Sequence, residues 1–290
     1  IARGTGVRGL INIQFAYVSE NLYVIEANPR ASRTVPFVSK ATGVQMAKAA
    51  VLIGLGKSIA ELKAEGYLPQ NMDGASLPEE TAIAVKAAVL PFARFRTPEG
   101  VVVDSLLSPE MRSTGEVMGL DKHYDTAFAK AQAGAGSPLP TSGKVFISVA
   151  NHDKRNVIIY AKMLESLGFE IVSTGGTAEI LRRNGLNSVL VASKFAEANG
   201  DHSIVDMVRN GDIDLILNTP AGGAARSDGY EIRAAAVSVG CPVMTTISEF
   251  AAAVQAINAL REHSWDIMSL QEHGVQLAAA VDARSEGGEA

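Results

Sequence analysis

Cysteine is nearly absent from this sequence, since Cys241 is the only one among 290 residues. A single thiol excludes an internal disulfide and any metal cluster built from cysteines, and it fits a reducing compartment. No apolar run approaches the ~18 residues that a spanning helix needs, and no basic and apolar leader stands at the start. We therefore expect a cytoplasmic protein with no membrane partner, and we assign Cys241 no nucleophilic role.

An excess of positive charge is also lacking. The chain has 26 Lys and Arg against 31 Asp and Glu, a formal net charge of -5, and the charges are interspersed. This pattern gives no sign of a nucleic-acid surface, so an anionic ligand would have to be held by a local cluster. The length and the 47% of hydrophobic residues are sufficient for two domains with substantial cores.

A hairpin is predicted near the start of the chain. Residues 10–17 alternate in polarity, a turn-like Ser-Glu-Asn cluster follows, and residues 22–28 form a second strand-like run. Two such runs joined by a short turn are typical of antiparallel strands. If the turn centres near Glu20, Gln14 lies opposite Glu26.

One face of this hairpin should end in polar side chains. Residues two apart on a strand share a face, so Glu26 and Asn28 point the same way and Arg30 continues the spacing. One carboxylate with the amide oxygens of Gln14 and Asn28 suits magnesium, and Arg30 and Arg33 could hold phosphoryl charge. The alternative is an exposed strand that ends at Glu26, followed by an ordinary turn.

The motifs QFAY (residues 14–17) and IEANPRASRTVPFVSKATG (residues 25–43) resemble the end of the second ATP-grasp unit of the carbamoyl phosphate synthetase large subunit. The resemblance implies ATP as substrate and two divalent ions, Mg2+ or Mn2+, bridging its phosphates. The ion-binding positions of the family match Gln14, Glu26 and Asn28, of which Gln14 and Glu26 also contact ATP. The arginine that contacts the transferred phosphoryl group matches Arg30, which makes Arg30 the catalytic candidate.

Several elements are predicted between this motif and a linker. We expect helices at 44–53, from a capping box at 58–61, and at 121–133, with a loop at 65–78 and a strand at 82–90. In the family, ornithine-responsive members have an acid at the position of Ala87, and its absence leaves activation by ornithine open. Residues 133–143 (AGAGSPLPTSG) are typical of a linker. We predict an ATP-grasp part at 1–133, a linker at 134–143, a second domain at 144–271 and a fraying tail at 272–290.

Beyond the linker, strand-like and helical stretches alternate regularly. The strands are expected at 144–149, 170–173, 188–192, 214–218 and 242–246. This alternation is typical of a doubly wound, Rossmann-like parallel sheet, which makes the chain an α/β protein after an α+β ATP-grasp part. Ligands bind at the carboxyl ends of such strands, and the candidates there are Lys154, Thr174, Thr177, Lys194, Asn218 and Thr219. Two lysines beside the Thr-Gly-Gly-Thr helix start predict a phosphate site.

This second half resembles the methylglyoxal-synthase-like domain that closes the same large subunit. In that domain the positions of the six candidates bind the phosphate and ribose end of the effectors UMP and IMP. Pro220 replaces a residue that has a hydroxyl in some members, so the preferred effector stays open.

The resemblance implies phosphorylation of carbamate to carbamoyl phosphate for pyrimidine and arginine biosynthesis, under nucleotide control. It also implies a glutaminase small subunit as partner and an oligomer of heterodimers. The chain matches about the last quarter of the subunit, so we expect it to be inactive alone. The alternatives are a UMP- or IMP-binding regulatory module, or a methylglyoxal synthase. For the latter, Asp201 is available as an acid, but residues 222–228 lack the required histidine.

Overall fold

The chain is described from a computed structural model, which covers residues 1–70, 81–94, 104–107, 110–194, 203–220, 229–262 and 265–287. Residues 71–78 of the predicted loop, Asp201 and residues 222–228 lie outside this description. Two compact units divide the chain, one formed by residues 1–83 with 266–290 and the other by residues 84–265. Each unit is therefore considered by itself.

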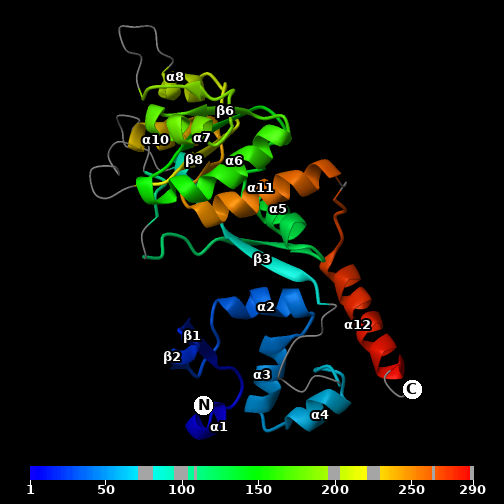
Figure 1. Ribbon diagram of the computed structural model, residues 1–290. Coiled ribbons are helices and arrows are strands. Elements are labelled where there is room, and N and C mark those ends of the chain that lie inside the picture. The colour runs from blue at the N-terminus through cyan, green and yellow to red at the C-terminus, as the bar shows by residue number, and fades with distance from the viewer. Residues whose placement is uncertain are drawn as a thin grey trace. The chain divides into compact units, whose positions relative to one another are not determined.

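The predicted hairpin is confirmed in the first unit (Figure 1). Strands β1 (Asn12–Val18) and β2 (Asn21–Asn28) pair in antiparallel fashion, with Gln14 opposite Glu26. Ser19 and Glu20 join them with φ of 49° and 63°. Two successive left-handed residues give the turn a twist that matches antiparallel strands, which fixes the register.

Helices form most of the remaining first unit. The predicted helices at 44–53 and from Ser58 are confirmed, and the second begins with the predicted capping box. In that box Ser58 N donates to Glu61 Oε2 at 2.7 Å, while Glu61 N donates to Ser58 Oγ at 3.2 Å. The helices of this unit are α1 (Ala2–Thr5), α2 (Thr34–Thr42), α3 (Met46–Gly54), α4 (Ile59–Ala64) and α12 (Leu270–Gly287).

Helix α12 occupies most of the segment 272–290 that was predicted as a fraying tail. A second capping box starts the helix, because Ser269 N donates to Glu272 Oε2 at 2.8 Å and Glu272 N donates to Ser269 Oγ at 3.2 Å. The alanine-rich sequence that follows has high helix propensity. The Ser-x-x-Glu spacing therefore indicates a helix start in the sequence itself. The small, polar residues at the C-terminal end made this signal easy to miss.

The second unit contains the predicted parallel sheet. Its five strands are β5 (Lys144–Ser148), β6 (Glu170–Ser173), β7 (Leu190–Val191), β8 (Leu215–Asn218) and β9 (Val243–Met244). Their order is β7-β6-β5-β8-β9, and every neighbouring pair is parallel. The order reverses between β5 and β8, which confirms the doubly wound fold. In such folds ligands bind outside the carboxyl ends of the strands at this reversal. The two edge strands are shorter than predicted, with two residues each.

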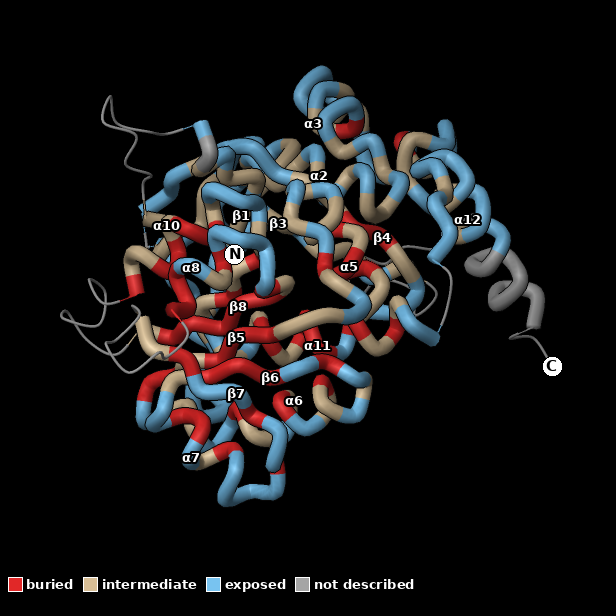
Figure 2. Tube along the Cα trace, turned by 90° about the horizontal axis from the view of Figure 1, so that it is seen from above, coloured by how far each residue is buried: buried red, intermediate tan, exposed pale blue. Residues whose placement is uncertain are grey.

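Helices cover both faces of the sheet. On β5, Val145 and Ile147 face one buried cluster while Phe146 faces the other, as the two-residue period of a strand requires. The first cluster includes side chains of α5 (Tyr124–Gly134), α6 (Lys154–Ser166), α7 (Gly175–Arg183) and α11 (Ile247–Glu262). The second includes side chains of α8 (Ile204–Arg209) and α10 (Tyr230–Val239). Figure 2 shows that the central strands and α11 are largely buried.

A smaller strand pair, β3 (Ile83–Ala88) with β4 (Glu116–Asp121), completes the fold. Strand β4 packs closely on α5, since any side chain at Gly119 would overlap the Ala127 carbonyl. Phe128 of α5 in turn belongs to the buried cluster that includes α11. The two compact units therefore divide near residue 83, whereas the predicted linker at 134–143 lies within the second unit. Within the described residues, no helix combines the length and apolar character needed to cross a membrane.

Candidate functional site

Three of the predicted metal-ligating residues lie together on the hairpin. Gln14 and Glu26 are cross-strand partners, and Asn28 Nδ2 donates a hydrogen bond to Glu26 Oε1 at 3.0 Å. The register shifts beyond this pair, because Phe15 lies opposite Val24. Such a bulge bends the strand and changes the direction of neighbouring side chains. The predicted juxtaposition of one carboxylate and two amides is present.

The chemistry of this trio fits a hard divalent cation. Carboxylate and amide oxygens are the donors that magnesium and manganese accept in proteins. Asn28 directs its amide nitrogen at Glu26, and a turn of the amide would bring its oxygen to that side. Across the described residues no group of three or more His, Cys, Asp or Glu could hold a metal. The trio has one carboxylate and is a site of a different type.

Arg30 faces its own loop. Its Nη1 donates to the Ala31 carbonyl at 3.0 Å, and its backbone N donates to the Asn28 carbonyl at 2.8 Å. Arg33 stands at the N-cap of α2. Among the described residues, no hydrogen bond or ion pair joins Arg30 to Glu26.

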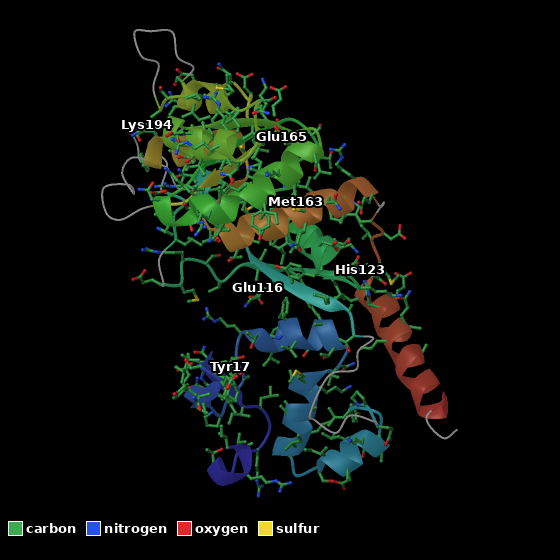
Figure 3. The ribbon with its side chains drawn as sticks, in the orientation of Figure 1. Tyr17, Glu116, His123, Met163, Glu165 and Lys194 are labelled. Atoms are coloured by element: carbon green, nitrogen blue, oxygen red, sulfur yellow. The ribbon has the colours of Figure 1, made fainter. Side chains whose placement is uncertain are left out.

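The hairpin is open to solvent. The exposed fraction is 64% for both Leu22 and Ile25 and 71% for Tyr17, whose position is labelled in Figure 3. A ribbon of two strands is marginally stable on its own in water. Gln14, Glu26 and Asn28 therefore lie on a support that buries little apolar surface.

The second group of predicted residues is built into the carboxyl edge of the parallel sheet. Thr177 Oγ1, from the first turn of α7, accepts a hydrogen bond from Val149 N at 3.4 Å. Thr219 Oγ1, just after β8, accepts one from Ala150 N at 2.9 Å. Both threonines are buried. Their hydroxyl oxygens thus hold the segment after β5 in place, while the hydroxyl hydrogens can still be donated.

The start of α7 adds features suited to an anion. Thr174 stands at its N-cap, and the Thr174 and Ser148 hydroxyls lie 3.2 Å apart. A Cβ added at Gly176 would lie 3.3 Å from Lys154 Nζ, which places the ammonium group beside the first turn of this helix. Free backbone N–H groups and a neighbouring cation both favour a phosphate.

Asn218, at the end of β8, is held by a residue that the sequence reasoning missed. Arg233 Nη1 donates to Asn218 Oδ1 at 2.9 Å, and the Arg233 guanidinium also contacts Asp104. Asn218 itself is buried. An arginine within the otherwise apolar stretch Ile-Arg-Ala-Ala-Ala was the available signal of an ion pair that lies inside the fold.

Lys194, which follows β7 and is labelled in Figure 3, forms an ion pair within the second unit. Its Nζ lies 2.7 Å from Glu231 Oε2 on α10. The hydrogen bond from Lys194 lowers the pKa of Glu231 below its ordinary value. Lys194, which the sequence predicts to bind phosphate, is therefore paired with a partly exposed carboxylate of α10.

A cavity of about 830 Å³ lies beside the segments that follow β5, β8 and β9. It is formed by η2 (Asn151–Asp153), the start of α6 and the segments after β8 and β9, and its lining includes His152, Arg155 and Thr246. Of the six predicted effector residues it contains Thr219. This cavity therefore adjoins the predicted phosphate site and does not coincide with it.

Cys241 has no features of a nucleophile. Burial, with a smaller contribution from Asp214, raises the pKa of its thiol to about 12. A thiol with that pKa stays protonated at neutral pH, and the protonated form is unreactive. The expectation from sequence agrees with this environment.

Comparison with protein families gives two matches. Residues 1–62 match the family described as "Carbamoyl-phosphate synthase L chain, ATP binding domain". Residues 156–245 match the family described as "MGS-like domain". The first match includes the whole hairpin trio, and the second includes five of the six predicted effector residues, with Lys154 just outside it.

Individual relatives extend the similarity over almost the whole chain. A carbamoyl phosphate synthase large chain from Kocuria rhizophila is 70% identical over 275 residues, which are 94% of this chain and 25% of the relative. Those from Paenarthrobacter aurescens and Streptomyces coelicolor are 65% and 56% identical over 98% and 97% of this chain. The chain spans about a quarter of the length of the curated relatives it matches.

Proposed function

Because the chain belongs to the family of carbamoyl phosphate synthase large chains, we propose that it supplies two parts of that enzyme. The first is the metal-binding edge of an ATP site at which carbamate is phosphorylated to carbamoyl phosphate. The second is a site for nucleoside monophosphate effectors. The observation that supports the catalytic proposal most directly is the Gln14–Glu26 cross-strand pair with Asn28 bound to Glu26.

In the catalytic part, Glu26, Gln14 and Asn28 would hold two divalent ions, Mg2+ or Mn2+. When bound, such ions neutralise the negative charge of the ATP phosphates. Arg30 would turn from its own loop toward the transferred group and stabilise its charge. A carbamate oxygen forms the new bond to the γ-phosphorus, and the bond from phosphorus to ADP breaks. Positioning and electrostatic stabilisation account for most catalysis in such transfers.

In the regulatory part, Lys154 and Lys194 would bind the phosphate of UMP or IMP together with the start of α7. Thr174 and Thr177 can donate their hydroxyl hydrogens to the same anion. Asn218 and Thr219 would contact the ribose end. This proposal is supported by the hydroxyl, amide and ammonium groups that lie close together at the carboxyl ends of β5, β6 and β8.

The remaining proposals concern the setting of this activity. We place it in the cytoplasm, in pyrimidine and arginine biosynthesis, with ammonia delivered by a glutaminase small subunit and with heterodimers that associate further. A regulatory module without catalysis is the second candidate. The hairpin is exposed, whereas the sheet edge is held by tertiary hydrogen bonds. This difference favours the regulatory module for the chain on its own.

Replacement of Glu26 by Gln in a large chain that contains this sequence tests the catalytic proposal. Loss of the carboxylate should reduce formation of carbamoyl phosphate from ATP, bicarbonate and ammonia at least a hundredfold, because metal and phosphate positioning fails. Glu20→Gln, in the turn of the same hairpin, is the matched control and should leave the rate unchanged. Near-normal synthesis by the Glu26→Gln variant would refute the assignment.

A further inference from the structure

Arg233 is the largest fully buried side chain among the described residues, with an exposed fraction of 0%. Its charge is matched by Asp104, since Nε donates to Oδ1 and Nη2 donates to Oδ2, both at 2.7 Å. This two-point contact fixes the plane of the guanidinium group. A buried charge needs such a partner, because the cost of removing it from water is high.

The fixed guanidinium group determines which hydrogen-bonding group of the Asn218 amide is available to a ligand. Arg233 Nη1 donates to Asn218 Oδ1 at 2.9 Å, which turns the amide oxygen toward the guanidinium and the amide nitrogen away from it. A primary amide has one oxygen that accepts and one nitrogen that donates. The Asn218 side chain therefore presents its NH2 group at the carboxyl end of β8, beside Thr219.

Gly229 leaves the space in which this contact forms. A Cβ placed on Gly229 would overlap both Arg233 Nη1 and Asn218 Oδ1. The backbone φ of Gly229 is −86°, which any residue can adopt, so close packing is what requires glycine here. The amide orientation of Asn218 is thus constrained by Arg233 on one side and by bare backbone on the other.

We propose that Arg233 is a positioning residue of the nucleotide site, which fixes Asn218 as a hydrogen-bond donor. The site then selects a ligand with an oxygen acceptor at this position, as a ribose hydroxyl or phosphate oxygen supplies. Asp104 holds Arg233 from a segment more than a hundred residues earlier in the chain. This inference rests on the proposed effector site and names how one of its residues is oriented.

The test measures binding of UMP and IMP to the 290-residue chain by calorimetric titration. Arg233→Lys keeps the charge beside Asp104 but cannot contact Asp104 and Asn218 at once, and we expect about tenfold weaker binding. Arg182→Lys is the matched control, because Arg182 donates to the Val189 carbonyl in the same unit and away from Asn218. It should bind UMP and IMP as the unmodified chain does.

A double-variant cycle separates positioning from general support of the fold. If Arg233 acts through Asn218, Arg233→Lys should add little to the loss already caused by Asn218→Ala. Additive losses would overturn the inference and leave the effector site standing. Absence of UMP and IMP binding by the unmodified chain would overturn both.

Asn218→Asp tests separately whether Asn218 donates to the ligand, and this test does not depend on how well the Arg233 variant folds. Aspartate has nearly the same size and still accepts from Arg233, but it offers the ligand no N–H donor and adds a negative charge that repels a phosphate. We expect at least tenfold weaker binding, and unchanged affinity would overturn the inference.

Discussion

The hairpin and the carboxyl edge of the parallel sheet both present residues suited to phosphate chemistry, but they are supported in different ways. On the hairpin, the polar contact that defines the trio joins Asn28 to Glu26, two residues away, and large apolar neighbours are exposed. At the sheet edge, Thr177 and Thr219 are buried and bond to backbone groups 28 and 69 residues distant. The first site is local, whereas the second is part of the tertiary fold.

This difference predicts how each site responds to substitution. A hydroxyl that both braces the backbone and faces a ligand cannot be removed without affecting stability and binding together. An exposed carboxylate or amide can be removed with little effect on the fold, so its loss is felt only in metal or phosphate binding. We therefore expect ligand binding and folding to be coupled at the sheet edge and separate at the hairpin.

Thr219→Val should have the largest effect on stability and should distinguish the sheet edge from the hairpin. The change keeps the shape but leaves the buried Ala150 N–H without its acceptor, which should cost about 1–3 kcal/mol. Gln14→Val, at an exposed strand position, should change the free energy of unfolding by less than about 0.5 kcal/mol. Urea unfolding followed by circular dichroism measures both. Equal effects of the two substitutions would contradict the contrast.

A smaller effect is expected from Glu231→Gln. Glu231 holds Lys194 at 2.7 Å, so a ligand phosphate must compete with it. Removal of this partly exposed charge should strengthen UMP binding about two- to fivefold, the range that such pairs contribute. Glu179→Gln, which removes an exposed charge paired with Arg183, is the matched control. The gain should vanish in a Lys194→Ala background, and a gain that persists there would show that Glu231 does not act through Lys194.

Much of the fold follows from short-range sequence patterns. The alternation of residues 10–17 and 22–28 and the Ser-Glu turn predicted the register that places Gln14 opposite Glu26, and the structure confirms it. The repeated strand and helix pattern likewise predicted the parallel sheet. These features depend on polarity period and turn chemistry, which a sequence displays directly.

The parts that were missed depend on contacts between distant residues. Nothing local indicates that Asp104 pairs with Arg233, 129 residues later, or that this pair orients Asn218. The position of the division between the two units was also not predictable, because it results from packing of α5 with α11 in one buried cluster. Helix α12 is a different case, since its Ser269 capping box was visible in the sequence.

Calorimetric titration of this chain with UMP, IMP and Mg-ATP, repeated with Lys154→Ala and Glu26→Ala, tests whether the sheet edge binds its ligand independently of the hairpin. We expect that a nucleoside monophosphate binds, that Lys154→Ala abolishes this binding, and that Glu26→Ala leaves it intact. No variant should give a signal with Mg-ATP. Monophosphate binding that is indifferent to Lys154, or Mg-ATP binding that depends on Glu26, would contradict this expectation.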